Sequence, residues 1–204
     1  MENIEENSKK EFNSWAKTYD SFFNHWYFSH TNKKIVSLLE INPKSSILDV
    51  GCGTGILIEN LIDKKYSKIY GIDISQEMVK MAKRKFSKNK KVKIFLGSAV
   101  KMPYKNNSFN FITCSNSFHH HPDSLKSLKE MYRILKPVGK LILLDAFKDG
   151  IIREIYTKII QKFEGRILHY YKDEIYNLFK KVGFSQINQQ NLGLLHLITI
   201  GEKM

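Results

Sequence analysis

The sequence predicts an α/β protein in which one seven-stranded sheet, mostly parallel with an antiparallel last strand, is covered by helices. Seven short runs of apolar and β-branched residues alternate with segments whose apolar residues recur at helical spacing. The last two runs, Phe184–Gln190 and Leu194–Ile200, are separated by a short Leu192-Gly193 turn, which indicates an antiparallel hairpin. An aromatic helical segment precedes the first strand and forms an N-terminal helical cap.

Length and composition fit a single structural domain. The chain has 204 residues, 42% of them hydrophobic, which is enough for a sizeable core. We expect a helical cap at residues 1–42 and a ligand-binding domain at residues 43–204. No apolar run approaches the roughly 18 residues of a membrane span, and the acidic start lacks a secretory signal, so we expect a cytoplasmic protein. Two cysteines, Cys52 and Cys114, provide neither a disulfide framework nor a zinc quartet.

The net charge of +13 raises the alternative of a nucleic-acid partner. The lysines, however, are scattered through predicted helices and turns. They cluster at Lys83–Lys91, where the one aromatic residue, Phe86, falls on the predicted inner face of a helix and is not placed for base stacking. We therefore favour a solvated basic surface and keep nucleic-acid binding as the alternative.

Residues 8–40 are predicted to be helical and are rich in aromatic side chains. A spacing of three or four residues places several of them on one helix face: Phe12, Trp15, Tyr19, Phe22, Phe23 and Trp26. This face can pack on the sheet, or it can close over a ligand. Both interpretations stay open from the residues alone.

The stretch Ile47–Gly55 predicts a buried strand that runs directly into a glycine turn and a helix. Glycines at alternate positions permit φ > 0 and let a ligand approach the backbone: Gly51, Gly53 and Gly55. Helical spacing resumes at Ile56, so a helix N-terminus offers free N–H groups there. The second strand, Lys68–Ile72, ends at Asp73, whose carboxylate can accept hydrogen bonds from two ribose hydroxyls.

Three consecutive histidines follow the fourth predicted strand, in the loop Ser115–His121. Consecutive side chains diverge, so at most two of them could meet one ion, and no carboxylate or cysteine stands nearby at ligand spacing. We therefore expect no metal. The next helix should begin at Pro122, with His121 facing outward. A fifth strand is predicted at Lys140–Asp145, and further helices at Ile151–Phe163 and Tyr171–Val182.

Five segments, in order, resemble the class I S-adenosylmethionine (SAM) methyltransferases. The first two are Phe12-Asn13-Ser14-Trp15-Ala16-Lys17-Thr18-Tyr19-Asp20, similar to F-x-x-x-A-x-x-Y-D, and Asp49 with Gly51-Cys52-Gly53-Thr54-Gly55, similar to an acidic residue before G-x-G-x-G. The others are Met102-Pro103-Tyr104 with Ser108-Phe109, Ser115-Asn116-Ser117-Phe118-His119-His120, and Leu135-Lys136-Pro137-Val138-Gly139-Lys140-Leu141. The resemblance is to the small-molecule branch that includes ubiquinone- and menaquinone-type enzymes, and it implies a Rossmann-like fold.

The resemblance also implies the cofactor SAM, with S-adenosylhomocysteine as product, and assigns residues 43–204 to the SAM-binding methyltransferase domain. The implied cofactor contacts are Tyr19, Asp49, Gly51, Cys52, Gly53, Thr54, Gly55, Asp73, Ile74, Met78, Ser98, Ala99, Ser115 and Asn116. At one of these positions the chain departs from the family. The family's G-D-A after the third strand is Gly97-Ser98-Ala99, so a hydroxyl replaces the usual carboxylate.

The implied reaction is SN2 transfer of a methyl group to a small-molecule acceptor. Its main requirement is alignment of the nucleophile, the methyl group and the sulfur. If the nucleophile keeps its proton, a histidine is the best candidate for the general base, with His120 favoured over His119. An RNA-modifying methyltransferase and a non-catalytic SAM-binding protein remain alternatives. Neither the acceptor nor the oligomeric state can be read from the residues.

Overall fold

The computed structural model of the chain describes residues 4–19, 21–150, 153–155, 158 and 168–204, without the side chains of residues 4, 5, 7, 17–19 and 22–24. The helices are α1 (Ile4–Tyr19), α2 (Phe22–Ser37), α3 (Ile56–Leu61), α4 (Gln76–Lys85), the 3₁₀ turn η1 (Phe118–His120), α5 (Ser124–Ile134) and α7 (Lys172–Val182). The strands are β1 (Ser46–Val50), β2 (Lys68–Asp73), β3 (Val92–Leu96), β4 (Phe109–Ser115), β5 (Leu135–Ala146), β6 (Phe184–Leu192) and β7 (His196–Lys203).

In the described part of the chain, seven strands form one sheet in the order β3-β2-β1-β4-β5-β7-β6. β1 pairs in parallel with both β2 and β4, whereas β7 runs antiparallel to β5 and β6. The predicted α/β sheet with an antiparallel last strand is therefore confirmed. The strand order reverses beside β1, and in such sheets a crevice opens beyond the carboxyl ends of the strands at that point.

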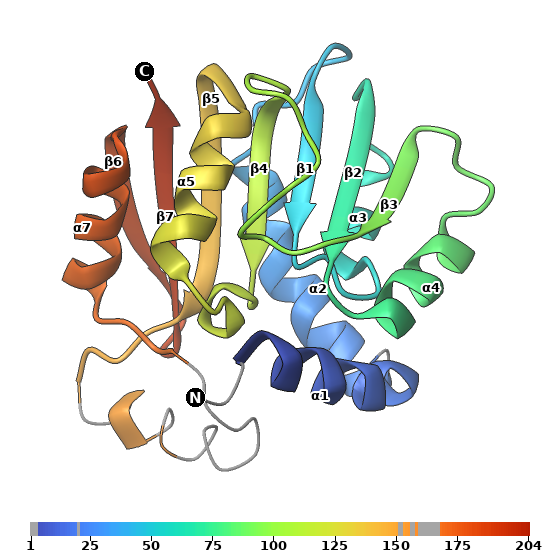
Figure 1. Ribbon diagram of the computed structural model, residues 1–204, viewed down its shortest axis with the longest axis horizontal. Coiled ribbons are helices and arrows are strands. Elements are labelled where there is room, and N and C mark those ends of the chain that lie inside the picture. Colours follow the sequence, from blue (N-terminus) through green and yellow to red (C-terminus); the bar gives the residue numbers. More distant parts are fainter. Residues whose placement is uncertain (1–3, 20, 151–152, 156–157, 159–167) are drawn as a thin grey trace.

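Helices cover both faces of the sheet (Figure 1). One face is buried under α2, α3 and α4, and its core includes Ile58, Ile69 and Ala82. The other face is buried under α5 and α7, with Leu128 and Phe179 fully enclosed. Because both faces are covered, the central strands are apolar on both sides, as parallel strands require. None of the helices in the described residues is both long and apolar enough to cross a membrane.

The N-terminal region forms two separate helices, so the predicted aromatic residues do not share the face of one continuous helix. α1 ends at Tyr19 and α2 begins at Phe22, with Ser21 in an extended conformation between the two. Figure 1 shows α1 running below the lower edge of the sheet, where β1 and β2 end. Asn13 fixes α1 there, because its Oδ1 accepts a hydrogen bond from Ser75 Oγ (2.7 Å) at the N-terminus of α4. The division of the chain at residue 42 stays a prediction.

The last two strands extend further along the chain than predicted, β6 to Leu192 and β7 from His196 to Lys203. Two other predicted boundaries were wrong for physical reasons. α5 begins at Ser124 rather than Pro122, because the Asp123 carboxylate caps it by accepting from the N–H of Lys126 (2.9 Å). β5 begins at Leu135 rather than Lys140, since Leu135 already pairs with Phe109 before a bulge. Most of the helix predicted at residues 151–163 lies outside the described residues.

The buried ring of Phe179 provides a test of this core. Phe179→Ala should lower the free energy of unfolding by about 3–5 kcal/mol, because the vacated space lies between α7 and the sheet. Tyr176→Ala on the same helix, where the side chain is 39% exposed, should change it by no more than about 0.5 kcal/mol. Urea unfolding followed by circular dichroism measures both. Equal losses in the two variants would contradict the described packing of α7.

Candidate cofactor and active site

The turn after β1 brings the backbone closer to its surroundings than a side chain would allow. Gly51 has φ +70°, and a Cβ built on it would lie 1.8 Å from Ser117 Oγ. Gly55 has φ +88°, and a Cβ there would lie 2.4 Å from the ring of Phe86. At both positions the left-handed conformation and the lack of space require glycine. The turn therefore exposes bare backbone at the carboxyl end of the sheet.

Asp73, the last residue of β2, bonds to this turn. Its Oδ2 accepts a hydrogen bond from the N–H of Gly53, and its Oδ1 accepts one from the N–H of Ser75, both at 2.8 Å. Burial raises the pKa of Asp73, and the hydrogen bonds from backbone N–H groups oppose this rise. Each oxygen keeps a lone pair that can accept a further hydrogen bond. Asp73 thus holds the loop in place and still lines the cleft.

Asp49 on β1 lies on the other side of the glycine turn. It is buried, and its Oδ1 accepts a hydrogen bond from Thr113 Oγ1 on β4 (2.8 Å). Burial, opposed by the Thr113 bond and assisted by the negative charge of Asp73, raises the pKa of Asp49 to about 7. An uncharged hydroxyl is a weak counterpart for a carboxylate. A cation bound beside Asp49 would therefore favour its ionised form.

A cleft extends on both sides of the glycine turn. One part, of about 670 Å³ including its open mouth, is lined by residues of the β2 and β3 ends and of η1, among them Asp73, Ile74, Met78, Ser98, Ala99 and His120. The other part, of about 340 Å³, is lined by Asp49, Cys52, Thr54, Ser115 and residues of α2. Gly51, Gly53 and Asn116 line both parts, so the two parts adjoin. Together they form one elongated site around the turn.

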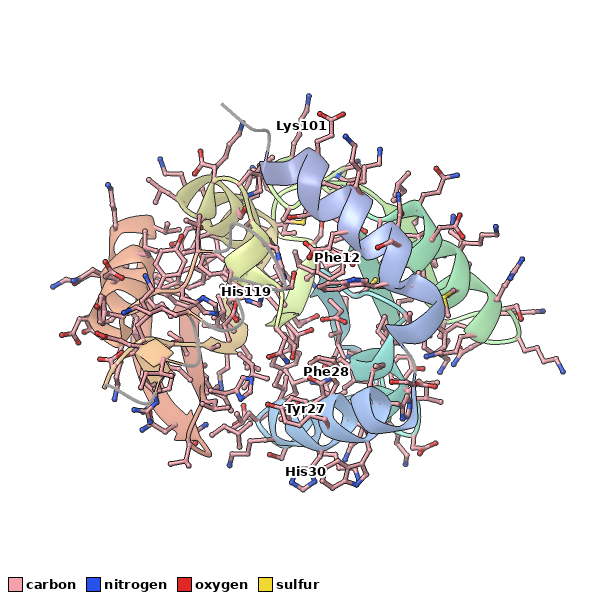
Figure 2. All side chains as sticks on the ribbon, turned by 90° about the horizontal axis from the view of Figure 1, so that it is seen from below. Phe12, Tyr27, Phe28, His30, Lys101 and His119 are labelled. Atoms are coloured by element: carbon pink, nitrogen blue, oxygen red, sulfur yellow. The ribbon has the colours of Figure 1, made fainter. Side chains whose placement is uncertain are left out.

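The cap helices supply two walls of this cleft. Phe12 of α1 lines the part that contains Asp73, and Phe28 of α2 lines the part that contains Asp49. Seen from below, Phe12 lies beside α1 and Phe28 beside α2, with His119 to the left of both (Figure 2). Asn32 of α2 accepts a hydrogen bond from Ser115 Oγ (2.7 Å), which joins the cap to the end of β4.

The three consecutive histidines are all buried, and each has a different environment. His120 lines the cleft, and its ring meets that of Phe12 edge-on, with centroids 4.8 Å apart. His119 does not line the cleft in the described structure; its Nδ1 lies 2.5 Å from Asp145 Oδ1. The prediction that His121 faces outward was wrong. Because α5 starts two residues later than expected, η1 turns His121 inward, with its Nε2 at 3.4 Å from Ser117 Oγ.

The protonation of these rings follows from burial. Burial, together with the charges of His119, His121 and His169, lowers the pKa of His120 well below its usual range. Burial lowers the pKa of His121 to about 4, with Asp145 opposing the shift. His120 is therefore a neutral imidazole at neutral pH; it offers a lone pair to a proton from a group in the cleft, as a weaker base than a free imidazole.

Most of the predicted site residues meet in this cleft. The exceptions are Gly55, which lies at the N-terminus of α3, and His119, which lies behind His120. The side chain of Tyr19 lies outside the described part of the structure. Among the described residues, no group of three histidine, cysteine or acidic side chains is placed to hold a metal ion.

Sequence reasoning missed other residues of the lining, including Ser8, Asn32, Ser117 and His121. Ser8 and Asn32 carry no motif, and only the folding of the cap over the sheet brings them to the cleft. Ser117 follows Asn116 in the same loop, so its position after β4 was a signal that could have identified it.

Comparisons with known proteins agree with this geometry. A family model described as a methyltransferase domain matches residues 48–143. The chain is 31% identical over 147 residues to a demethylmenaquinone methyltransferase of Bacillus mycoides, covering 66% of this chain and 61% of that protein. It is 28% identical over 204 residues to a demethylmenaquinone methyltransferase of Staphylococcus epidermidis, covering 92% of this chain and 84% of that protein.

A solved structure shares the fold. It is a SAM-dependent methyltransferase from Aquifex aeolicus, with a TM-score of 0.75 and 24% sequence identity, covering 94% of this chain and 98% of that chain. The glycine turn, the Asp73 carboxylate and the order of the strands agree with the family match. The chain is therefore similar to the class I SAM-dependent methyltransferases, in sequence over residues 48–143 and in its overall fold.

Proposed function

We propose that the protein transfers a methyl group from SAM to a small, planar acceptor and that His120 receives the acceptor's proton. The observation that carries this proposal is the single cleft that joins the glycine turn and Asp73 to the neutral ring of His120. The cleft thus has a place for the cofactor and, beside it, a group that can act on an acceptor. The chain spans 61% of the B. mycoides relative, so the acceptor is part of the proposal.

The residues present fit SAM. Asp73 has free lone pairs for ribose hydroxyls, and the turn at Gly51 and Gly53 leaves room for a ligand against the backbone. Ile74 and Met78 offer an apolar wall for the adenine ring, with Ser98 and Ala99 beside it. Asp49 stands where a cationic group of the cofactor would stabilise its ionised form. When bound, SAM supplies an electrophilic methyl group.

The acceptor side of the cleft favours a flat molecule. Phe12 and His120 line it as an edge-to-face pair of rings, and aromatic rings of this kind pack favourably against another ring. Demethylmenaquinone, named for the curated relatives, is the first acceptor to test. The scattered lysines of the chain provide no comparable feature for RNA.

Ligand-induced stabilisation tests the cofactor. SAM or S-adenosylhomocysteine at about a hundred times its Kd should stabilise the fold by about 2.7 kcal/mol, whereas NAD should not. Thermal unfolding with each ligand measures this, and a methyl-transfer assay with demethylmenaquinone and simple phenols follows. Stabilisation by NAD alone would contradict the proposed site. Stabilisation by SAM without transfer to any acceptor would favour a non-catalytic SAM-binding protein.

The raised pKa of Asp49 predicts a pH-dependent cofactor affinity. Without ligand the carboxyl is half-protonated near pH 7, and a cationic ligand selects the ionised form. SAM affinity should therefore rise about tenfold per pH unit from pH 5 to 7 and level off above. Without ligand, the pKa of Asp49 is higher in the folded protein, near 7, than in the unfolded chain, at about 3.9. The free energy of unfolding should therefore fall as pH rises from about 4 to about 7, whereas SAM affinity rises.

Isothermal titration calorimetry across this pH range measures the effect, with Asp49→Asn as the control. The amide in this variant cannot titrate, so its SAM affinity should be flat with pH. An equal slope in both proteins would show that another group is responsible.

The role of His120 predicts a selective loss of rate. His120→Ala should lower kcat by about 10²–10⁴ if the imidazole accepts the acceptor's proton. The KM for SAM should change little, because the Asp73 and glycine-turn contacts remain. Steady-state kinetics with a known acceptor measures both constants. A loss of less than tenfold would mean that alignment alone drives the reaction and that His120 only lines the acceptor side of the cleft.

A further inference from the structure

A buried carboxylate behind the cleft holds the turn that carries His120. Asp145 is the penultimate residue of β5, and its side chain is 3% exposed. Its Oδ2 accepts a hydrogen bond from the backbone N–H of His119 (3.0 Å), and its Oδ1 faces the ring Nδ1 of the same residue (2.5 Å). One carboxylate therefore fixes both the backbone and the ring of His119, and neither group lines the cleft.

The opposite side of η1 is fixed as well. The N–H of Leu168 donates to the carbonyl of His119 (2.9 Å), and the ring of His169 stacks on the His119 ring at 5.3 Å. The next residue, Tyr170, is tied to α5 through Ser124 Oγ (2.5 Å). His119 is thus held between β5 and the segment that precedes α7. Its neighbour His120, with ring centroids 4.1 Å apart, lines the cleft, as does His121.

The charges around η1 differ on its two sides. Burial alone would raise the pKa of Asp145, but the charge and hydrogen bonds of His119, with a smaller effect of His169, lower it overall. An ionised carboxylate only accepts, so the Nδ1 of His119 must carry the hydrogen. The groups near His120 include the rings of His119, His121 and His169 and, from α1, the uncharged Phe12. The negative charge therefore stays with His119, behind His120.

We propose that Asp145 is a positioning residue, which through its two hydrogen bonds to His119 fixes η1 so that His120 is presented to the acceptor. The inference rests on the proposed function for its catalytic consequence, since His120 acts in the cleft. Its structural content is independent of that function. Asparagine would keep one acceptor for the backbone N–H of His119 but would turn a donor toward Nδ1, so the ring would keep its bond only by changing tautomer.

Amide hydrogen exchange measured by NMR tests the positioning directly, without a substrate. The N–H groups of His120 and His121 bond to the carbonyls of Ser117 and Phe118 within η1. In Asp145→Asn these amides should exchange at least about tenfold faster, since the turn loses its anchor. The matched control is Glu130→Gln, because Glu130 also accepts from a backbone N–H, that of Met102, and from a side chain, but far from η1.

A conservative variant of His119 separates the role of its Nδ1–H bond to Asp145 from other roles of the His119 ring. The amide nitrogen of asparagine can donate from the place of Nδ1, so His119→Asn should keep the slow exchange at η1. His119→Phe lacks this donor and should exchange as fast as Asp145→Asn; it also serves if Asp145→Asn does not fold. Unchanged exchange in both Asp145→Asn and His119→Phe would overturn the inference, as would an equal acceleration in Glu130→Gln.

Steady-state kinetics tests whether loss of the Asp145 hydrogen bonds slows methyl transfer. Asp145→Asn should lower kcat by about 10–100-fold, the usual effect of losing a group that orients a functional histidine. The KM for SAM should stay within about twofold, because the pair does not touch the cofactor side of the cleft. If exchange at η1 accelerates and kcat does not fall, the link from Asp145 to His120 is wrong. If no acceptor is methylated by the wild-type protein, the proposed function fails while the exchange result still decides the positioning role.

Discussion

The hydrogen bond from the Gly53 N–H to the carboxylate of Asp73 joins the ends of β1 and β2, and the cleft depends on it. The same turn is held a second time, because the N–H groups of Gly51 and Cys52 both bond to the carbonyl of Ile72 (2.8 and 3.1 Å). These bonds keep bare backbone exposed between two strand ends. The chain leaves β1 at Gly51 with φ > 0 and close to Ser117, a conformation and a space that no other residue fits without strain. The shape of the glycine turn is thus set by hydrogen bonds of its backbone N–H groups, to the Ile72 carbonyl and to the Asp73 carboxylate.

Three aspartates lie at the carboxyl ends of strands, Asp49 and Asp145 buried and Asp73 partly buried, and their partners give them different charges. Asp49 has only an uncharged hydroxyl from Thr113 and the nearby Asp73, so its pKa is raised to about 7. Asp73 has backbone N–H partners, which only partly offset its burial. Asp145 has a histidine, whose charge and hydrogen bonds lower its pKa despite burial. The same side chain therefore serves as a titrating group, a loop anchor and a fixed negative charge, according to what faces it.

The helical cap is joined to the cleft through uncharged polar contacts. Asn13 of α1 meets Ser75 and Asn32 of α2 meets Ser115, so each cap helix reaches a different part of the site. Each hydrogen bond of this kind contributes about 0.5–1.5 kcal/mol to the free energy of unfolding, which is modest beside the contribution from burying the apolar side chains of the sheet core. The cap therefore closes the cleft with apolar rings, Phe12 and Phe28, while a few polar bonds set where those rings stand.

The sequence by itself determined the α/β class, the antiparallel ending and the place of the glycine turn, because these depend on local periodicity and on residues with special backbone conformations. It also identified Asp73 and the loop after β4, since the ends of parallel strands meet at one edge of the sheet. Only the tertiary structure decided how the histidines are used. Which of His119, His120 and His121 faces the cleft depends on the Asp123 cap of α5 and on Asp145, which is 26 residues from His119. Such contacts join segments far apart in the chain, and no local pattern records them.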